Sequence, residues 1–101
     1  MNKLLRLTTA IVFTFLTSIS MAGDPVAGKA KSVTCAACHG ANGISPNDMW
    51  PNLAGQKKGY LVSQLQMFRD GRRVNGMMTA MSKGLSDDDI ANLAAYYSSL
   101  K

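Results

Sequence analysis

Apolar residues in the second half of the chain recur with the period of an α-helix. Leu61, Leu65 and Phe68 fall at positions i, i+4 and i+7, which places them on one stripe of a helix. This spacing predicts a helix over residues 59–71, with Gly71 as its natural stop. The simplest interpretation of the stripe is that it packs into the core.

The last predicted helix has the clearest boundaries. Ser86 is a good N-cap, and Asp89 stands three residues later, in the position that completes a capping box. The acidic run 87–89 also complements the positive end of the helix dipole. Four apolar positions then form the expected buried stripe: Ile90, Leu93, Ala94 and Tyr97. Capping therefore explains the acidic run better than a partner site does.

A third helix is predicted nearer to the N-terminus. Asp24 is a good N-cap, and Pro25 is favoured at the first helical position because its missing N–H costs nothing there. The helical run 26–36 then leads directly into the two cysteines of the chain. Gly28 lies inside this run, where glycine costs about 1 kcal/mol relative to alanine. Either a close helix contact or a tolerated defect accounts for it.

Two segments between the predicted helices are irregular. Glycines and prolines break residues 40–56, and a loop of that length in a compact domain usually wraps something. Residues 72–84 are predicted to form a second loop, with Asn75-Gly76 as a turn. This loop contains a dense group of methionines: Met77, Met78 and Met81.

Residues 1–22 have the features of a secretory signal peptide. Lys3 and Arg6 form its positive end, residues 7–19 are mostly apolar, and small residues precede the expected cleavage after Ala22. The alternative is a retained membrane anchor, but the apolar run is shorter than the roughly 20 residues that span a bilayer. We therefore predict a periplasmic protein with no stable membrane anchor and one domain at residues 23–101.

The densest chemistry of the chain lies at residues 35–39. Cys35 and Cys38 are three positions apart and His39 follows directly, which is the C-x-x-C-H pattern that attaches c-type haem. The thiols can add to the haem vinyl groups as thioethers, and the imidazole can bind the iron. Three alternatives are weaker. A thioredoxin-like pair lacks its βαβ pattern, structural zinc lacks four ligands, and a plain disulfide leaves the single His unexplained.

One covalent haem per chain also explains how so short a domain folds. A chain of this size is near the lower limit for a self-sufficient core, so we expect the haem-free protein to be poorly folded. Trp50 and Leu53 are candidates to cover the haem, and the Pro51 carbonyl is a candidate acceptor for the Nδ1–H of His39. Because the chain has no second His, a six-coordinate iron needs a thioether from one of the methionines.

The charge of the chain is modest. Eleven basic residues include Lys3 and Arg6 of the signal, so nine remain against six acidic residues, or +3 before haem is counted. Five basic residues lie within one third of the chain: Lys57, Lys58, Arg69, Arg72 and Arg73. This cluster either steers an acidic redox partner to the haem edge or is an ordinary solvated face. Nucleic acid is not expected as a partner because the chain has no interleaved aromatic platform.

Several motifs occur together in a familiar order. Cys-Ala-Ala-Cys-His-Gly at 35–40 is followed by Trp-Pro-Asn-Leu-Ala-Gly-Gln at 50–56, the methionine-rich loop, and Leu-Ser-Asp-Asp-Asp-Ile at 85–90. This order resembles the class I c-type cytochromes and is most similar to one haem module of the cytochrome c4 group. The resemblance implies an all-α fold in which three main helices and their loops wrap one covalent haem.

The resemblance also implies roles for particular residues. It favours Met78, seven residues before Leu85, as the second iron ligand, with Met81 as the runner-up. It further implies that Pro51 orients His39. The first and last helices are then expected to cross through Gly28 and an aromatic residue, Tyr96 or Tyr97.

These expectations favour a one-electron carrier between respiratory redox proteins, with its iron held by His39 and Met78. Two other classes of function stay open. One is a haem-bearing subunit of a larger oxidoreductase, and the other is a small haem enzyme or gas binder with an open distal site. The chain has no distal His for the latter. Since a cytochrome c4 has two such modules, the resemblance does not decide whether this chain acts alone, pairs with itself or serves as a subunit.

Overall fold

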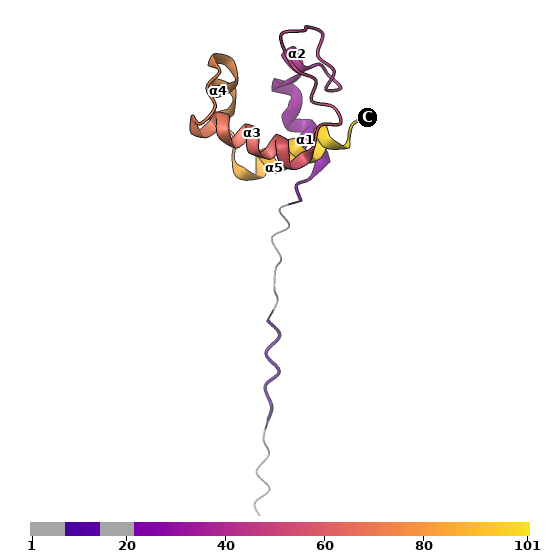
Figure 1. The fold of residues 1–101 in the computed structure, drawn as a ribbon. Coiled ribbons are helices and arrows are strands. Elements are labelled where there is room, and N and C mark those ends of the chain that lie inside the picture. Colours follow the sequence, from indigo (N-terminus) through magenta and orange to yellow (C-terminus); the bar gives the residue numbers. More distant parts are fainter. Residues whose placement is uncertain (1–7, 15–21) are drawn as a thin grey trace, which may run out of the picture.

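Helices are the regular secondary structure of the described chain. The structure is a computed structural model that describes residues 8–14 and 22–101 (Figure 1). Its elements follow in this order: α1 (Pro25–Lys31), the 3-10 helix η1 (Ser32–Thr34), α2 (Ala36–His39), α3 (Lys58–Asp70), α4 (Gly76–Ser82) and α5 (Asp87–Ser99). The predicted all-α fold is confirmed.

The predicted signal peptide lies largely outside the described residues. Its residues 8–14 are described, form no helix or strand, and are exposed away from the helical body (Figure 1). Within the described ranges, no helix is long and apolar enough to cross a membrane. The cleaved signal at residues 1–22 therefore stays a prediction.

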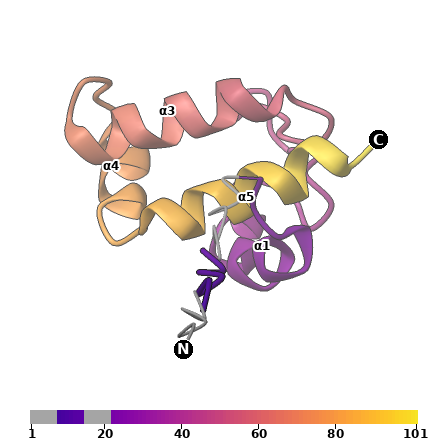
Figure 2. The same ribbon diagram turned by 90° about the horizontal axis from the view of Figure 1, so that it is seen from below.

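Two long helices form the base of the domain. α3 and α5 lie side by side, and α1 packs against the other side of α5 (Figure 2). α4 and the segment that contains α2 rise from this base on opposite sides (Figure 1). The apolar core lies between the helices, at Leu61, Phe68, Ile90, Leu93, Ala94, Ala95, Tyr96 and Tyr97. Both predicted apolar stripes contribute to it, with Leu65 partly buried against the same cluster.

The crossing of α1 and α5 explains the glycine inside α1. A Cβ atom on Gly28 would lie 1.9 Å from the carbonyl oxygen of Asn92 and 2.8 Å from the Cβ of Tyr96. Only glycine permits this approach, so the helix contact accounts for the unfavourable propensity. Of the two aromatic residues expected at the crossing, the structure places Tyr96 there.

The predicted continuous helix over 26–36 is wrong. Asp24 caps α1 as expected, accepting from the N–H of Val26 at 2.9 Å, but α1 ends at Lys31. The N–H of Ser32 is shared between the carbonyls of Gly28 and Lys29, and its hydroxyl donates to Lys29 at 2.7 Å. A shared bond of this kind tightens the last turn, and the chain continues as η1 before α2 begins.

The prediction of a loop over 72–84 is also wrong, because this stretch contains α4. Asn75 does not form a turn with Gly76. Instead its side chain accepts from the N–H of Met78 at 3.1 Å, and its own N–H donates to the Thr79 hydroxyl at 3.0 Å. Asn75 is therefore the N-cap of a short helix. The sequence contained this capping signal, but a short helix with three methionines has no distinct apolar stripe.

The other two helices begin and end close to the predicted positions. α3 starts at Lys58 and stops where Gly71 adopts a left-handed conformation with φ of 78°. At α5, the Ser86 hydroxyl accepts from the N–H of Asp89 and the Asp89 carboxylate accepts from the N–H of Ser86, both at 3.0 Å. The predicted capping box is confirmed.

Candidate haem site

A cavity of about 840 Å³ opens between the two raised sides of the domain. Its volume lies near the upper end of the range of roughly 300–1,000 Å³ found for small-molecule and cofactor sites. Mainly apolar side chains from α3, α4, α5 and residues 49–56 line it, and Arg73 is the one Lys, Arg, Asp or Glu among the described lining residues. Because an empty apolar cavity costs stability in proportion to its volume, the site is suited to a large apolar group that fills it.

The three residues of the haem motif meet at one wall of this cavity. Cys35 precedes α2, Cys38 and His39 lie within it, and all three line the cavity. Both cysteines are partly buried, and no disulfide joins them. The spacing of the thiols along one turn is what attachment at two points of a porphyrin edge requires.

The imidazole of His39 is held in one orientation. Its side chain is 6% exposed, and Nδ1 lies 2.8 Å from the carbonyl oxygen of Pro51, as the sequence predicted. A carbonyl can only accept, so Nδ1 carries a proton, and in the neutral imidazole Nε2 then has the free lone pair. A neutral imidazole with a free Nε2 is the form that binds iron.

A glycine turn holds the loop that carries Pro51. The N–H groups of Leu53 and Ala54 both donate to the Gly43 carbonyl, at 2.8 and 3.0 Å, and Gly43 has a φ of 77°. The next residue, Gly55, donates to the carbonyl of Tyr97 in α5 at 2.9 Å. Backbone hydrogen bonds therefore tie this loop both to itself and to the base of the domain.

Trp50 and Leu53 line the same cavity, as expected of residues that cover a haem. Trp50 is partly buried, and Leu53 packs against the core cluster. The structure adds Met49, which also lines the cavity and is 83% exposed. No pattern in the sequence distinguished Met49 from an ordinary loop residue.

The three methionines of α4 all line the wall opposite α2. Met77 and Met81 are one turn apart on the helix and are 58% and 46% exposed. Met78 is partly buried and shares its side of the helix with Ser82, which is fully buried. Helix geometry therefore turns Met78 further inward than the other two.

Tyr97 belongs to the site, although the sequence indicated it only as a core residue and as a candidate for the helix crossing. It lines the cavity beneath Cys35 and is 3% exposed. Burial raises the pKa of the Tyr97 phenol, and the neighbouring Cys35 side chain raises it further, while Ser32 lowers it. The phenol is therefore protonated at any physiological pH.

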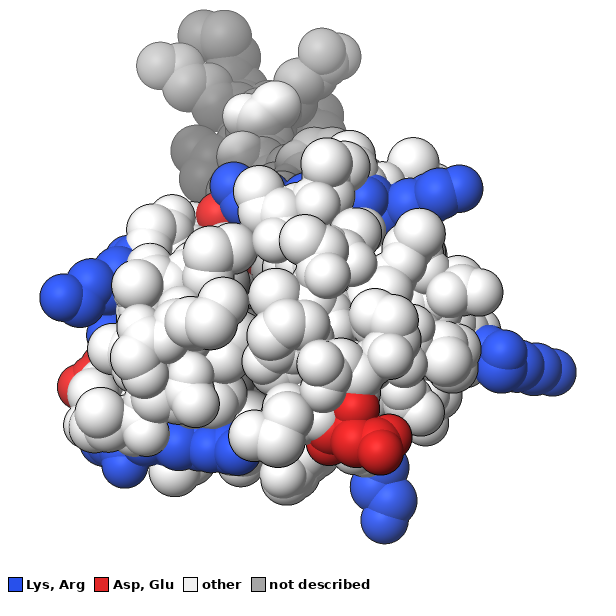
Figure 3. All heavy atoms as spheres, turned by 90° about the horizontal axis from the view of Figure 1, so that it is seen from above, with Lys and Arg blue, Asp and Glu red and all other residues white. Residues whose placement is uncertain are grey.

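The five basic residues of the predicted cluster do not form one continuous patch. Lys57 and Lys58 lie at the start of α3, whereas Arg69 lies in its last turn, about 16 Å away along the helix. Arg69 is paired with Asp87 at 2.8 Å and its side chain is 23% exposed. Seen from the cavity side, charged side chains lie around the edge of the face and its centre is uncharged (Figure 3).

The structure provides no support for the other interpretations of the motif. Among the described residues, no group of three or more His, Cys, Asp or Glu is placed to hold a metal ion. The wall that carries the motif belongs to a helical domain and not to a βαβ unit. Cys35, Cys38 and His39 thus fit a covalently attached haem, with His39 as the residue that would bind its iron.

Comparison with known proteins agrees with this site. The family model described as "Cytochrome c" matches residues 25–101. Cytochrome c-554(548) of Halomonas halodenitrificans is 52% identical over 77% of this chain and 98% of its own length. Cytochrome c4 of Pseudomonas aeruginosa is 45% identical over 100% of this chain and 50% of its own length.

Solved structures give the same result. The crystal structure of reduced cytochrome c4 from Pseudomonas stutzeri matches with a TM-score of 0.75 and 44% identity, covering 79% of this chain and 47% of that one. The chain thus spans about half the length of the cytochromes c4 that it matches. Two further relatives are named thiosulfate dehydrogenase electron acceptor.

The chain belongs to the cytochrome c family. Its cofactor is haem c, for which Cys35, Cys38 and His39 provide the attachment motif. Within the family it is a cytochrome c4-like electron carrier and not an enzyme.

Proposed function

We propose that this protein is a periplasmic one-electron carrier whose haem iron is held by His39 and Met78. The observation that carries the proposal is that both side chains line the same cavity. Nδ1 of His39 is hydrogen-bonded to the Pro51 carbonyl, and Met78 lies on the facing wall. When bound, the haem supplies a reversible one-electron couple, and a methionine opposite a histidine raises its reduction potential. The protein binds the haem, orients His39 and excludes water.

Trp50, Pro51 and Leu53 complete the haem-binding set in this proposal. Pro51 fixes the tautomer of His39 through its carbonyl, whereas Trp50 and Leu53 cover one face of the haem. Their apolar surface lowers the local dielectric, which is one of the means by which a protein sets the potential of a haem. Bond-making chemistry on a substrate is not part of this role.

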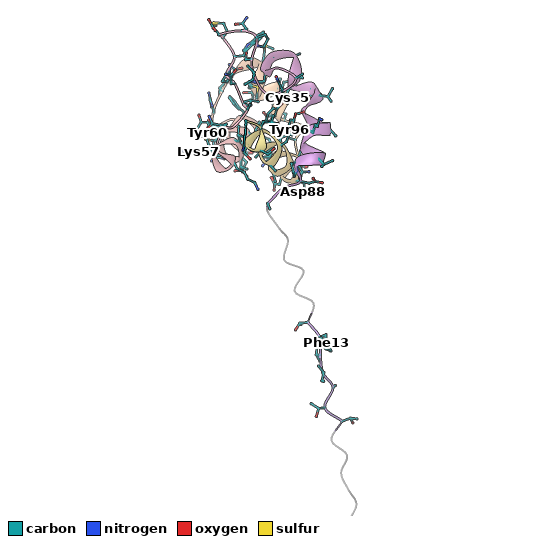
Figure 4. All side chains as sticks on the ribbon, turned by 90° about the vertical axis from the view of Figure 1, so that its right-hand side faces the viewer. Phe13, Cys35, Lys57, Tyr60, Asp88 and Tyr96 are labelled. Carbon is teal, nitrogen blue, oxygen red and sulfur yellow. The ribbon has the colours of Figure 1, made fainter. Side chains whose placement is uncertain are left out.

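Electron exchange would occur at the open mouth of the cavity. Its uncharged centre is edged by both basic and acidic side chains, and Lys57 lies beside the cavity-lining Tyr60 (Figures 3 and 4). We assign Lys57, Lys58, Arg72 and Arg73 to steering an acidic redox partner toward this mouth. Arg69 belongs to the predicted cluster, but its side chain is only 23% exposed and is paired with Asp87, whereas the Arg72 side chain is 60% exposed despite its pair with Asp70.

The decisive test is the absorption spectrum of the purified ferric protein and of two variants. We expect low-spin bands with a weak band near roughly 700 nm, as Met-ligated ferric haems show. Met78→Ala should remove this band, and Met81→Ala, a methionine on the same helix and cavity, should keep it. High-spin bands in the unmutated protein, or loss of the band only in Met81→Ala, would contradict the proposed ligand pair.

The export step has its own test. Expression in a bacterium with a c-type cytochrome maturation system should yield periplasmic protein that starts after Ala22, as measured by intact mass. A protein that keeps residues 1–22 and sediments with the membrane would show an anchor instead. The haem spectrum can be read in either case, so the two parts of the proposal are tested separately.

A second candidate function follows from the relatives named thiosulfate dehydrogenase electron acceptor. By that analogy the chain would be a haem-bearing subunit that stays docked in a larger oxidoreductase. Size-exclusion chromatography of the protein from its native host separates the two roles. A free carrier elutes near its own mass, and a subunit elutes together with a larger enzyme.

A further inference from the structure

The three methionines lie in a segment that leaves the base of the domain and returns to it. This methionine segment comprises residues 71–86, between the end of α3 and the start of α5, and contains α4. At three glycines of the segment, Gly71, Gly76 and Gly84, an added Cβ would have no other atom within 4 Å. Much of the segment therefore stands in open surroundings.

Arg69 joins the two ends of the methionine segment. It lies in the last turn of α3, and its Nη1 is 2.8 Å from the Asp87 carboxylate at the start of α5. The same Nη1 lies 3.2 Å from the carbonyl oxygen of Leu85, and Nε lies 3.3 Å from Asp70. One partly buried side chain thus holds the point of exit and the point of return together.

The other ties of the segment are local, lie at its entrance, or lie at its return, where Ser86 and Asp89 form the capping box of α5. Asn75 caps α4, and Leu85 donates to the Ser82 carbonyl at 3.1 Å, both within the segment. Arg73 donates to Gln64 at 2.6 Å and stacks over Phe68, and these two contacts hold the start of the segment against α3. Among the side chains of α3, Arg69 is the one with described polar contacts to residues 85–87, where the chain returns to the base of the domain.

We propose that Arg69 is a positioning residue that holds the methionine segment closed over the haem and so slows dissociation of Met78 from the iron. The inference rests on the proposed ligation by Met78. Separately, the hydrogen bond that Arg69 donates to the Asp87 carboxylate raises the pKa of Arg69, so the guanidinium is charged at any working pH. Loss of this bond would remove the ion pair that joins α3 to the start of α5, and would leave the return of the segment held mainly by the Ser86–Asp89 capping box and by the packing of Leu85.

Imidazole exchange in the ferric holoprotein measures how often the methionine leaves the iron. At saturating imidazole the observed rate equals the rate of methionine dissociation, and loss of the band near roughly 700 nm reports it. We expect Arg69→Gln to raise this rate about tenfold, as removal of a charged hydrogen-bond donor suggests. Arg69→Lys keeps the charge but not the forked geometry, so its rate should lie between those of Arg69→Gln and the unmutated protein.

Arg72→Gln is the matched control. Arg72 pairs with the same Asp70 at 3.2 Å and has no described contact with residues 85–87. Its exchange rate should stay within about twofold of the unmutated rate, the size of effect expected for an exposed ion pair. Equal rates in Arg69→Gln and Arg72→Gln would overturn the inference.

The partner residue provides an independent test that does not alter α3. Asp87→Asn should raise the exchange rate as Arg69→Gln does, while Asp88→Asn, at the next position of the same helix turn, should not. The double variant of Arg69 and Asp87 should exchange no faster than the faster single variant, because both changes remove one interaction. Additive effects would contradict the proposal. Should Arg69→Gln fold poorly, Asp87→Asn against Asp88→Asn decides it.

Failure of this inference is distinguishable from failure of the proposed function. An unmutated ferric protein without the methionine band would remove the ligation on which both depend. A normal band together with unchanged exchange in Arg69→Gln and Asp87→Asn would overturn only the role of Arg69.

Discussion

The two walls of the haem cavity are held in different ways. On the histidine wall, the His39 imidazole is fixed by the Pro51 carbonyl at 2.8 Å, and the loop that carries this carbonyl is tied by further backbone hydrogen bonds to Gly43 and Tyr97. On the methionine wall, a seven-residue helix is capped by Asn75 and tied to the base through arginine side chains. Backbone ties are short and rigid, whereas arginine ties lose more side-chain entropy on forming.

This difference indicates that one wall holds the haem permanently and that the other can open. The histidine side is anchored by two thioether positions, a fixed tautomer and a glycine turn, so it serves as the permanent frame of the haem. The methionine side is the part with exposed residues and open glycines, so Met78, the proposed second ligand, is the one expected to dissociate first. Local openings concentrate where buried apolar contacts are few.

Removing the haem should have the largest effect on the helix content of the domain, because the cavity that the haem fills lies between both walls. A Cys35→Ala/Cys38→Ala variant that lacks covalent haem should lose more than about half of the far-ultraviolet helical signal, since a domain of this size cannot sustain so large an empty cavity. Circular dichroism measures this, with Met78→Ala as the control that keeps the covalent haem. Native helicity in the haem-free variant would show that the helices pack without it.

A pair of glycine substitutions should show that the α1–α5 crossing tolerates an added Cβ less well than the methionine wall does. Gly28→Ala forces a Cβ to within 1.9 Å of the Asn92 carbonyl, so we expect it to lower the free energy of unfolding by about 2–3 kcal/mol. Gly76→Ala, at the open first position of α4, should change it by less than about 1 kcal/mol and in the stabilising direction. Denaturant unfolding of the two holoprotein variants measures both, and equal destabilisation would contradict the comparison.

The smallest expected effect is on the pH dependence of folding stability, and it arises at the start of α5. The hydrogen bonds from Ser86 hold the pKa of the Asp89 carboxyl below its usual value, with a smaller contribution from Lys31 at 3.5 Å. A depressed pKa in the folded state stabilises the protein above the unfolded pKa of about 4, and this stabilisation is lost as the pH falls through the folded pKa. Asp89→Asn should therefore reduce the fall in Tm between about pH 5 and pH 2.

Asp88→Asn is the control for that measurement. Asp88 lies in the same first turn and no capping bond is described for it. Its pH profile should follow that of the unmutated protein more closely than the profile of Asp89→Asn does. A parallel shift of both variants would assign the effect to the helix dipole and not to the capping box.

Much of the local structure could be predicted from neighbouring residues alone. The motif at 35–39, the caps at Asp24 and Ser86 and the stripe of α3 each depend on residues a few positions apart, and the structure contains all of them. The predicted bond from His39 to Pro51 spans twelve residues and is also present. It could be expected because a ligating imidazole needs an acceptor for its second nitrogen.

Only the tertiary structure decided the features that depend on which distant groups come together. The sequence allowed Tyr96 or Tyr97 at the helix crossing, and the close approach of Gly28 to α5 selected Tyr96. The sequence placed Arg69 in a basic cluster, and the return of the chain at Asp87 made it an internal tie. Residue type and spacing determine what a side chain can do, but its partner is set by the path of the backbone, which is fixed here by packing around one cavity.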